Sequence, residues 1–250
     1  CAEDYAYKHC DKVVSLLEYS KDYMVEHGLS EEKFNCLSNG IDREEWEAPL
    51  PVPNLHKELL ANLKNEGKFI VSRIGGNCWS CLVGIISNNL DALLDAAKMI
   101  DDTDICFVLV GEGSCKVKLK ERIVKENINN VIFLPGVNKK AVPDLVKDFD
   151  IVTIFAANSP LYRFGICMNK IFDAMMAGKP IVMSITAPET IIERSSAGIV
   201  TKAGNLNSYI KAIYNYKNLT QDEIKKIGNK GRELVAREYT YDSIAAKFID

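Results

Sequence analysis

The chain has 250 residues, of which 47% are hydrophobic, and this length predicts one domain with a substantial core plus an appendage. Its 31 basic and 34 acidic residues nearly balance, which argues against nucleic acid as a partner. No apolar run approaches the roughly 20 residues of a membrane span, and no signal peptide is visible, so we expect a cytoplasmic protein.

Eight cysteines are scattered along the chain, and only Cys78 and Cys81 form a closely spaced pair. Zinc sites of this type need a second Cys or His pair, which the three histidines do not supply. We therefore expect reduced thiols, no metal site and no redox function. The chain starts at Cys1 without a methionine, directly in helix-like sequence, and we expect it to be part of a longer protein.

Strand and helix signals alternate along the chain, as is typical of a parallel sheet covered by helices. A first piece comprises residues 12–17, a helix over residues 20–27, and residues 33–42. Pro49, Pro51 and Pro53 then mark an extended connector, because proline lacks an N–H donor and keeps its predecessor out of helix.

The second and larger part continues the alternation and predicts a doubly wound α/β domain (Rossmann-like). Strands are predicted at residues 69–74, 105–110, 131–134, 151–155 and 181–185. Helices are predicted at residues 55–64, 90–100, 117–128, 141–149 and 169–177. The pattern ends with residues 188–197, 198–203, 206–216 and a long amphipathic stretch over residues 221–248.

Residues 162–180 contain the most informative segment, a glycine-containing loop that leads into a short helix. Unpaired N–H groups and the positive end of the dipole suit a phosphate at such a helix start. We expect Asn169 to be the N-cap and Lys170 to add a positive charge beside it. Asp173 lies one turn later, where its carboxylate could bind a ribose diol. The segment therefore predicts a nucleotide-sugar site, although an ordinary capped helix has the same pattern.

Four further motifs follow one another in a characteristic order: Gly-Glu-Gly at residues 111–113, VIFLPGV at 131–137, FDIVTIFAANS at 149–159 and DAMMAGKPIV at 173–182. In this order the chain resembles, over residues 5 to 250, the C-terminal half of the family-four retaining glycosyltransferases, which have the GT-B architecture. It is most similar to members that handle N-acetylated amino sugars in surface-polysaccharide synthesis.

The resemblance implies a division of the chain into four parts. Residues 1–46 would be the tail of an N-terminal acceptor domain, and residues 47–57 a proline-rich linker. Residues 58–236 would form the nucleotide-sugar-binding domain. Residues 237–250 would form a C-terminal helix that packs back toward the N-terminal domain.

The resemblance also implies how the donor is held. Gly111 and Gly113 would lie at a strand exit beside the donor, and the loop Leu134, Pro135, Gly136 and Val137 would meet the base, with uracil expected. The diphosphate would bind backbone groups at the residues Phe164, Gly165 and Ile166 together with Asn169 and Lys170.

One family feature is absent from the sequence. The family's signature has two acids eight residues apart, and Asp173 matches the second, but the residue eight positions earlier is Gly165. Arg163 stands nearest the usual first acid, and Arg73 supplies one charge of the basic pair that usually follows the first strand. We therefore take Arg163 and Lys170 as the candidate catalytic residues, acting on the leaving diphosphate without a metal.

The expected activity is transfer from a UDP-sugar, as substrate and with no cofactor, to a lipid-linked or saccharide acceptor. Through its N-terminal domain the protein could associate peripherally with the inner face of the plasma membrane. A UDP-sugar epimerase of similar fold and a catalytically silent binding module stay open. A dinucleotide-dependent dehydrogenase is disfavoured, because Lys116 stands where the third fingerprint glycine belongs.

Overall fold

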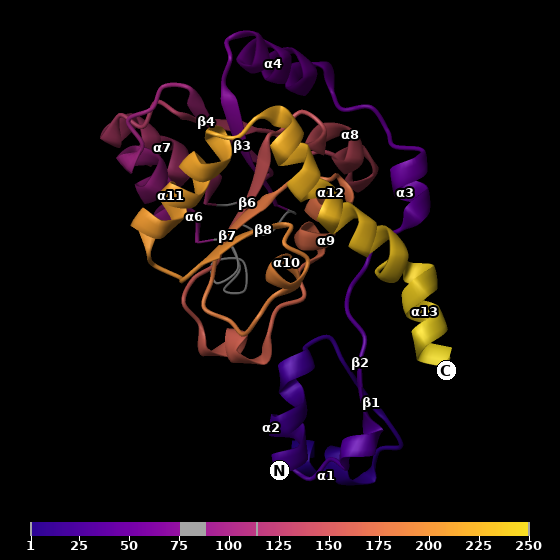
Figure 1. The fold of residues 1–250 in the computed structure, drawn as a ribbon. Coiled ribbons are helices and arrows are strands. Elements are labelled where there is room, and N and C mark those ends of the chain that lie inside the picture. The colour runs from indigo at the N-terminus through magenta and orange to yellow at the C-terminus, as the bar shows by residue number, and fades with distance from the viewer. Residues whose placement is uncertain (1, 76–88, 114, 250) are drawn as a thin grey trace.

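A six-stranded parallel sheet forms the centre of the molecule, in the order β5-β4-β3-β6-β7-β8 (Figure 1). The computed structural model describes residues 2–75, 89–113 and 115–249. The strands are β3 (Phe69–Ile74), β4 (Ile105–Val110), β5 (Val131–Leu134), β6 (Ile151–Phe155), β7 (Ile181–Ser184) and β8 (Gly198–Thr201). The predicted doubly wound parallel α/β fold is thereby confirmed.

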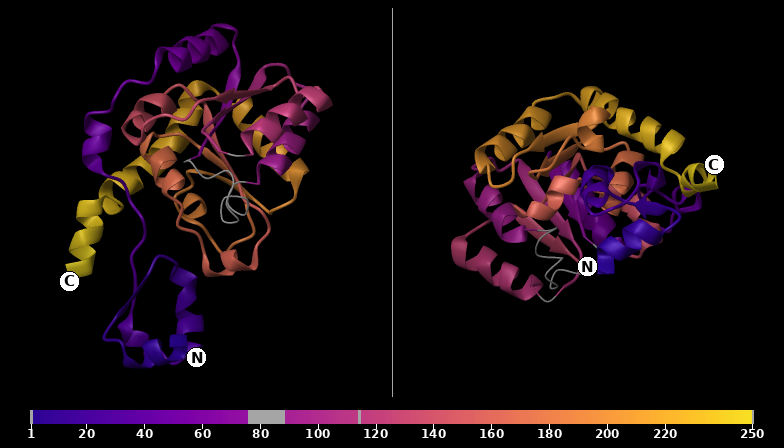
Figure 2. Two further views of the ribbon diagram at one scale, coloured as in Figure 1. Left: turned by 180° about the vertical axis from the view of Figure 1, so that it is seen from behind. Right: turned by 90° about the horizontal axis from the view of Figure 1, so that it is seen from below.

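Helices cover both faces of this sheet (Figure 2). They are α4 (Asn54–Asn65), α6 (Leu90–Met99), α7 (Lys116–Glu126), α8 (Val142–Val146), α9 (Asn169–Met176), α10 (Ile191–Arg194), α11 (Leu206–Lys217) and α12 (Gln221–Glu238). Successive strand residues point to opposite faces. In β4, Val108 accordingly joins the core shared with α4, α8 and α9, whereas Phe107 joins the core shared with α6, α7 and α11.

The order of the strands reverses direction once. From β3 the chain moves outward through β4 to β5, then returns to β6 on the other side of β3 and continues outward to β8. In open α/β sheets, ligands bind outside the carboxyl ends of the strands at such a switch point. A ligand site is therefore expected at the carboxyl ends of β3 and β6.

Close backbone packing holds α9 against α12. Gly178 ends α9 with a φ of +66°, and a Cβ atom added at Gly228 of α12 would lie 1.8 Å from the carbonyl oxygen of Gly178. A Cβ atom at Gly231 would lie 3.2 Å from the Cβ of Met175 of α9. Glycine in α12 thus lets the two helices approach at backbone distance, and this contact positions the helix that carries Lys170 and Asp173.

A small piece at the amino terminus lies apart from the sheet and is joined to it by a single segment of chain (Figure 1). Its elements are α1 (Ala2–His9), β1 (Val13–Ser15), the 3-10 turn η1 (Glu18–Ser20), α2 (Lys21–Glu26), η2 (Glu31–Lys33) and β2 (Phe34–Cys36). Strands β1 and β2 pair in parallel. The joining segment contains the short helix α3 (Arg43–Glu47).

The joining segment pairs with the C-terminal region. The N–H of Ile41 donates to the carbonyl of Tyr239 at 2.9 Å, and the N–H of Tyr241 donates to the carbonyl of Ile41 at 3.0 Å. The amphipathic stretch predicted over residues 221–248 is therefore two helices, α12 and α13 (Tyr241–Ile249), because Ile41 takes backbone partners at the break. Within the described ranges, no helix is both long and apolar enough to cross a bilayer.

Candidate active site

The start of α9 lies beyond the carboxyl end of β6, at the switch point of the sheet. Its N-cap is Met168, with extended dihedrals of −96° and 126°, and the N–H of Ile171 donates to the Met168 carbonyl. Asn169 is thus the first helical residue, and its prediction as the N-cap was wrong by one position. The helix begins without a capping hydrogen bond from the Met168 side chain, so its first turn suits an anionic ligand.

Two cations meet at this helix start. Arg73, the fifth residue of β3, is only 1% exposed, and Gly75 leaves room for its guanidinium, since a Cβ there would lie 2.0 Å from Nη1. Burial lowers the pKa of Arg73 to about 10. Burial, and then the charge of Arg73, lower the pKa of Lys170 to about 7. The sequence placed Arg73 as one charge of a basic pair after the first strand of the domain, and in the structure its charge acts on Lys170. An anion bound here would relieve the repulsion.

Asp173 lies one turn into α9 with 15% of its side chain exposed. Its Oδ1 accepts a 2.6 Å hydrogen bond from Lys139 of η3 (Lys139–Ala141), the turn that follows the exit of β5. Burial raises the pKa of Asp173, and Lys139 opposes that rise. Asp173, which the sequence predicts to bind the ribose, is therefore paired with a lysine 34 residues earlier in the chain.

The exits of β4 and β5 are tied together by Lys116. Its Nζ donates to the carbonyls of Gly111 at 2.8 Å and Leu134 at 3.2 Å, and it pairs with Glu112 at 2.9 Å. Glu112 in turn accepts from the N–H of Gly136 at 3.4 Å. The residue that disfavoured a dinucleotide fingerprint thus organises two of the predicted donor loops.

The predicted base loop divides into buried and accessible parts. Leu134 is 2% exposed and belongs to the core, so it contributes backbone rather than side chain, whereas Pro135 and Gly136 are exposed and Val137 is partly buried. His56 of α4, itself buried, donates from Nε2 to the carbonyl of Pro135 at 2.9 Å. This hydrogen bond fixes the loop to α4. Gly113, at the end of the Gly-Glu-Gly motif, accepts at its carbonyl from the N–H of Lys116.

The loop before α9 faces the N-terminal piece. It forms the turn η4 (Pro160–Phe164), and the Arg163 guanidinium carbon lies 4.5 Å from the centroid of the Phe164 ring. That ring meets Tyr23 of α2 edge-on at 5.5 Å. Arg163 and Phe164 are therefore grouped with the N-terminal piece, while Lys170 is grouped with Arg73.

Gly165 has a φ of +97°, a region that favours glycine, and a Cβ there would lie 3.2 Å from the Tyr19 ring. The next residues are held by the joining segment, because Asn39 donates from its side chain to the carbonyl of Cys167 at 2.8 Å and from its backbone to the Cys167 sulfur at 2.9 Å. Ile166 lies between these two anchors and packs partly buried against the core. The loop predicted to cradle the diphosphate is thus supported from the N-terminal side.

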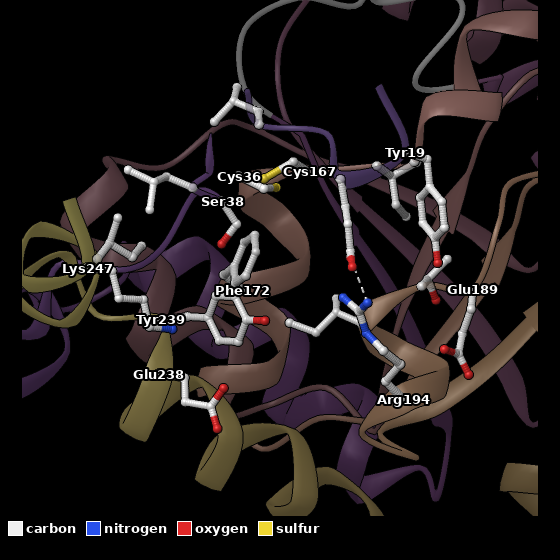
Figure 3. Close-up of a pocket in the computed structure, with 18 residues that line it drawn as sticks. Tyr19, Cys36, Ser38, Cys167, Phe172, Glu189, Arg194, Glu238, Tyr239 and Lys247 are labelled. Atoms are coloured by element: carbon white, nitrogen blue, oxygen red, sulfur yellow. Dashed lines mark hydrogen bonds and ion pairs between the residues drawn. The ribbon is translucent and has the colours of Figure 1, made fainter. Parts of the chain in front are cut away.

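A cavity of about 190 Å³ opens between this loop and the N-terminal piece (Figure 3). The rings of Phe172 and Tyr239, with centroids 5.4 Å apart, stand on one side of it and Arg194 on the other (Figure 3). Arg194 pairs with Glu18 of η1 at 2.8 Å, which joins the two parts of the chain. Phe172 borders this cavity, whereas Lys170 and Asp173 line a separate cavity of about 20 Å³.

The cysteines in the described part of the chain are free thiols, namely Cys10, Cys36, Cys106, Cys115 and Cys167. The Cys78 and Cys81 pair lies outside the described residues. Among the residues that are described, no group of three or more His, Cys, Asp or Glu side chains is arranged to hold a metal.

A comparison with known families matches more than half of the 250 residues. Residues 81–217 match the family described as glycosyl transferases group 1. The chain is also 27% identical over 179 residues to a poly(ribitol-phosphate) alpha-N-acetylglucosaminyltransferase of Staphylococcus aureus (strain COL), covering 68% of this chain and 34% of that protein. The chain thus spans about a third of this curated relative.

Solved structures show the same fold at lower identity. HepE from Anabaena, crystallised with UDP and glucose, matches with a TM-score of 0.71 and 18% identity over 99% of this chain and 64% of that chain. A TarM variant from S. aureus, in complex with fondaparinux, alpha-GlcNAc-glycerol and UDP, matches with a TM-score of 0.67 and 19% identity over 98% of this chain and 44% of that chain.

Proposed function

The chain belongs to the group 1 glycosyltransferases, and from this membership we propose that it is the donor-binding half of a retaining enzyme. That enzyme would transfer a sugar from a UDP-sugar to a lipid-linked or saccharide acceptor. The observation that carries the proposal is the meeting of Arg73 and Lys170 at the start of α9, at the switch point of the sheet. This arrangement is suited to a diphosphate.

The chemistry follows from where charge develops. When the bond between the sugar and the diphosphate breaks, negative charge builds up on the departing diphosphate oxygens. Lys170, Arg73 and the N–H groups of the first turn of α9 would stabilise that charge from fixed positions, which is an effective form of catalysis. Because these groups supply positive charge, we propose that departure proceeds without a metal.

The remaining contacts are assigned by position. Asp173 would bind the ribose, and the exposed backbone of Pro135 and Gly136 would meet the uracil. Arg163 stands on the side of η4 that faces the N-terminal piece, where the sugar and acceptor would enter, and it is our second catalytic candidate. The name of the S. aureus relative supports N-acetylglucosamine or a related amino sugar as the transferred group.

We further propose that the protein works in the cytoplasm at the inner face of the plasma membrane, where its N-terminal domain would meet the acceptor. A catalytically silent binding module is the second candidate. One observation favours it: Gly165, with its φ of +97°, stands eight residues before Asp173, where the family's first acid belongs.

Ligand-dependent melting tests the donor assignment. UDP and UDP-sugars should raise the melting temperature of the chain, whereas NAD and ATP should not. At 100 times its dissociation constant, a bound ligand adds about 2.7 kcal/mol to the free energy of unfolding. Lys170→Met should abolish most of the UDP effect, and Lys202→Met, an exposed lysine beyond β8, is the matched control. Equal stabilisation by ATP would contradict the uridine assignment.

Turnover separates the enzyme from the silent module. We expect the 250-residue chain to bind a UDP-sugar without transferring it. The acceptor side of the cleft, which we propose is formed by the N-terminal domain, holds the reactants together and excludes water. A chain extended at its amino terminus by about one domain should release UDP in the presence of acceptor. Binding without UDP release by the extended chain would favour the silent module instead.

A further inference from the structure

Lys139 joins two carboxylates that come from different parts of the fold. Its Nζ lies 2.6 Å from Oδ1 of Asp173 on α9 and 3.9 Å from Oε2 of Glu45 on α3. The lysine side chain is 53% exposed, whereas the Asp173 and Glu45 side chains are 15% and 20% exposed. A solvent-facing ammonium group therefore covers two largely buried carboxylates at the edge of the proposed donor site.

The surroundings of Asp173 do not favour its ionised form. It lines a cavity of about 20 Å³ whose other walls are mostly apolar, with Ile74, Val142 and Val152 among them. Burial in such a place favours the protonated acid. A protonated carboxyl group loses acceptor capacity, whereas the ionised group can accept from both hydroxyls of a ribose. A cation beside Asp173 therefore favours the ionised form that can accept from a diol.

We propose that Lys139 is a positioning residue for nucleoside binding: its ammonium group holds Oδ1 of Asp173 and leaves Oδ2 directed to the ribose diol. This inference rests on the proposed function. In the described part of the chain, Oδ2 accepts no hydrogen bond, while Oδ1 accepts from Lys139. Oε2 of Glu45 lies 3.9 Å from the same Nζ, so helix α3 adds a second carboxylate to the surroundings of Lys139.

Among the described residues, four charged groups lie beside Asp173 or act on its neighbours, and the test must separate them. Lys139 comes from η3 and Lys170 from α9 itself, with which Asp173 shares the small cavity. Arg73 of β3 acts on Lys170, and Glu45 of α3 lies next to Lys139. Helix α8 and strand β6 contribute apolar side chains to this cavity. Lys139 is the cation hydrogen-bonded to the carboxylate, so its removal should change the pKa of Asp173 more than removal of the other groups would.

Uridine is the appropriate probe because it has the ribose and base but no phosphate, so it does not draw on Lys170 for charge. The experiment measures uridine affinity of the 250-residue chain from pH 4.5 to 8 by calorimetry or NMR titration. In the wild type, affinity should fall with decreasing pH as Asp173 takes up a proton. In Lys139→Met this fall should lie about one to three pH units higher, since a neighbouring opposite charge lowers a carboxyl pKa by that amount.

Three further variants locate the effect. Lys139→Arg keeps the cation and should retain the wild-type profile, and Asp173→Asn should bind weakly with no acid limb. Lys140→Met is the matched control, because Lys140 is the exposed neighbour of Lys139 and should leave the profile unchanged. If Lys139→Met does not fold, as judged by its melting curve, Lys139→Gln replaces it in the same comparison.

The outcomes distinguish this inference from the function on which it rests. An acid limb at the same pH in the wild type and in Lys139→Met would overturn the positioning role, even if affinity fell equally at every pH. Tighter uridine binding by Lys139→Met at every pH would also overturn it, because Lys139 would then compete with the ribose. If the wild type bound neither uridine nor UDP, the proposed function itself would fail, and the inference with it.

Discussion

Replacing Lys170 by methionine should abolish the proton uptake that accompanies UDP binding. Burial and the nearby Arg73 hold the pKa of Lys170 near 7. A bound diphosphate adds negative charge beside the amine and restores its usual preference for the protonated form. UDP binding should therefore draw a proton from solvent whenever Lys170 starts out neutral. Methionine is unbranched like lysine, is one atom shorter and has no group to protonate.

The size of the effect follows from the pKa. With half of the lysines neutral at pH 7, each UDP bound should take up about 0.5 proton, rising to about 0.9 at pH 8. The sign is fixed by the linkage: because the complex binds more protons than the free protein, UDP affinity should fall as pH rises above about 7. Loss of the charged hydrogen bond should cost about 1.5–3 kcal/mol, or roughly 10- to 150-fold in affinity.

Calorimetric titration in buffers of different ionisation enthalpy measures this proton uptake directly. Working at pH 7 to 8.5 keeps the UDP phosphate ionised, since phosphate groups of this kind titrate near pH 6. Lys202→Met should take up as many protons as the wild type, and Lys170→Met should take up none. Uptake that is absent in the wild type, or that persists in Lys170→Met, would refute the assignment of Lys170 as the diphosphate-binding amine.

Three other predictions concern stability and ligand class. Gly228→Ala should destabilise the chain by about 1–3 kcal/mol in denaturant unfolding, although alanine ordinarily stabilises a helix by about 1 kcal/mol over glycine. A stabilised variant would contradict the backbone contact between Gly228 and Gly178. Lys230→Ala, on the exposed side of α12, is the control. Asp173→Ala should weaken uridine and UDP by similar factors, and a selective loss of UDP in a binding assay would reassign Asp173. Chelators and reductants should leave the melting temperature unchanged, and a stoichiometric zinc signal by elemental analysis would overturn the expectation of plain thiols.

The sheet was predictable because its strands are short apolar runs with sharp ends. β3, β4, β5 and β6 begin and end where the sequence indicates, since strands buried on both faces read as continuous hydrophobic segments. The break between α12 and α13 was not predictable in the same way. It depends on Ile41, about 200 residues away in sequence, whose backbone takes hydrogen bonds that a continuous helix would have kept.

The candidate site was predictable in its local parts only. The segment from Asn169 to Asp173 indicated a helix start with a cation and a carboxylate, because those residues follow one another in sequence. The partner of Asp173 was not foreseen, since Lys139 and Glu45 come from separate elements and carry no motif that would connect them. In the sequence, Lys116 was used only as evidence against a dinucleotide fingerprint, because it replaces a glycine. Its side chain in fact donates to carbonyls at the exits of both β4 and β5.

The pairing of Ile41 with residues 239 and 241 has a mechanical consequence. The joining segment passes from the N-terminal piece into the main domain at the same place where α12 gives way to α13, and the two chains are hydrogen-bonded to each other there. The N-terminal piece is also tied to the main domain by the Glu18–Arg194 ion pair and by the hydrogen bonds of Asn39 to Cys167. Its Tyr19 and Tyr23 rings lie against Gly165 and Phe164. A displacement of the N-terminal piece relative to the Ile41 pairing would therefore be passed to the loop that precedes α9.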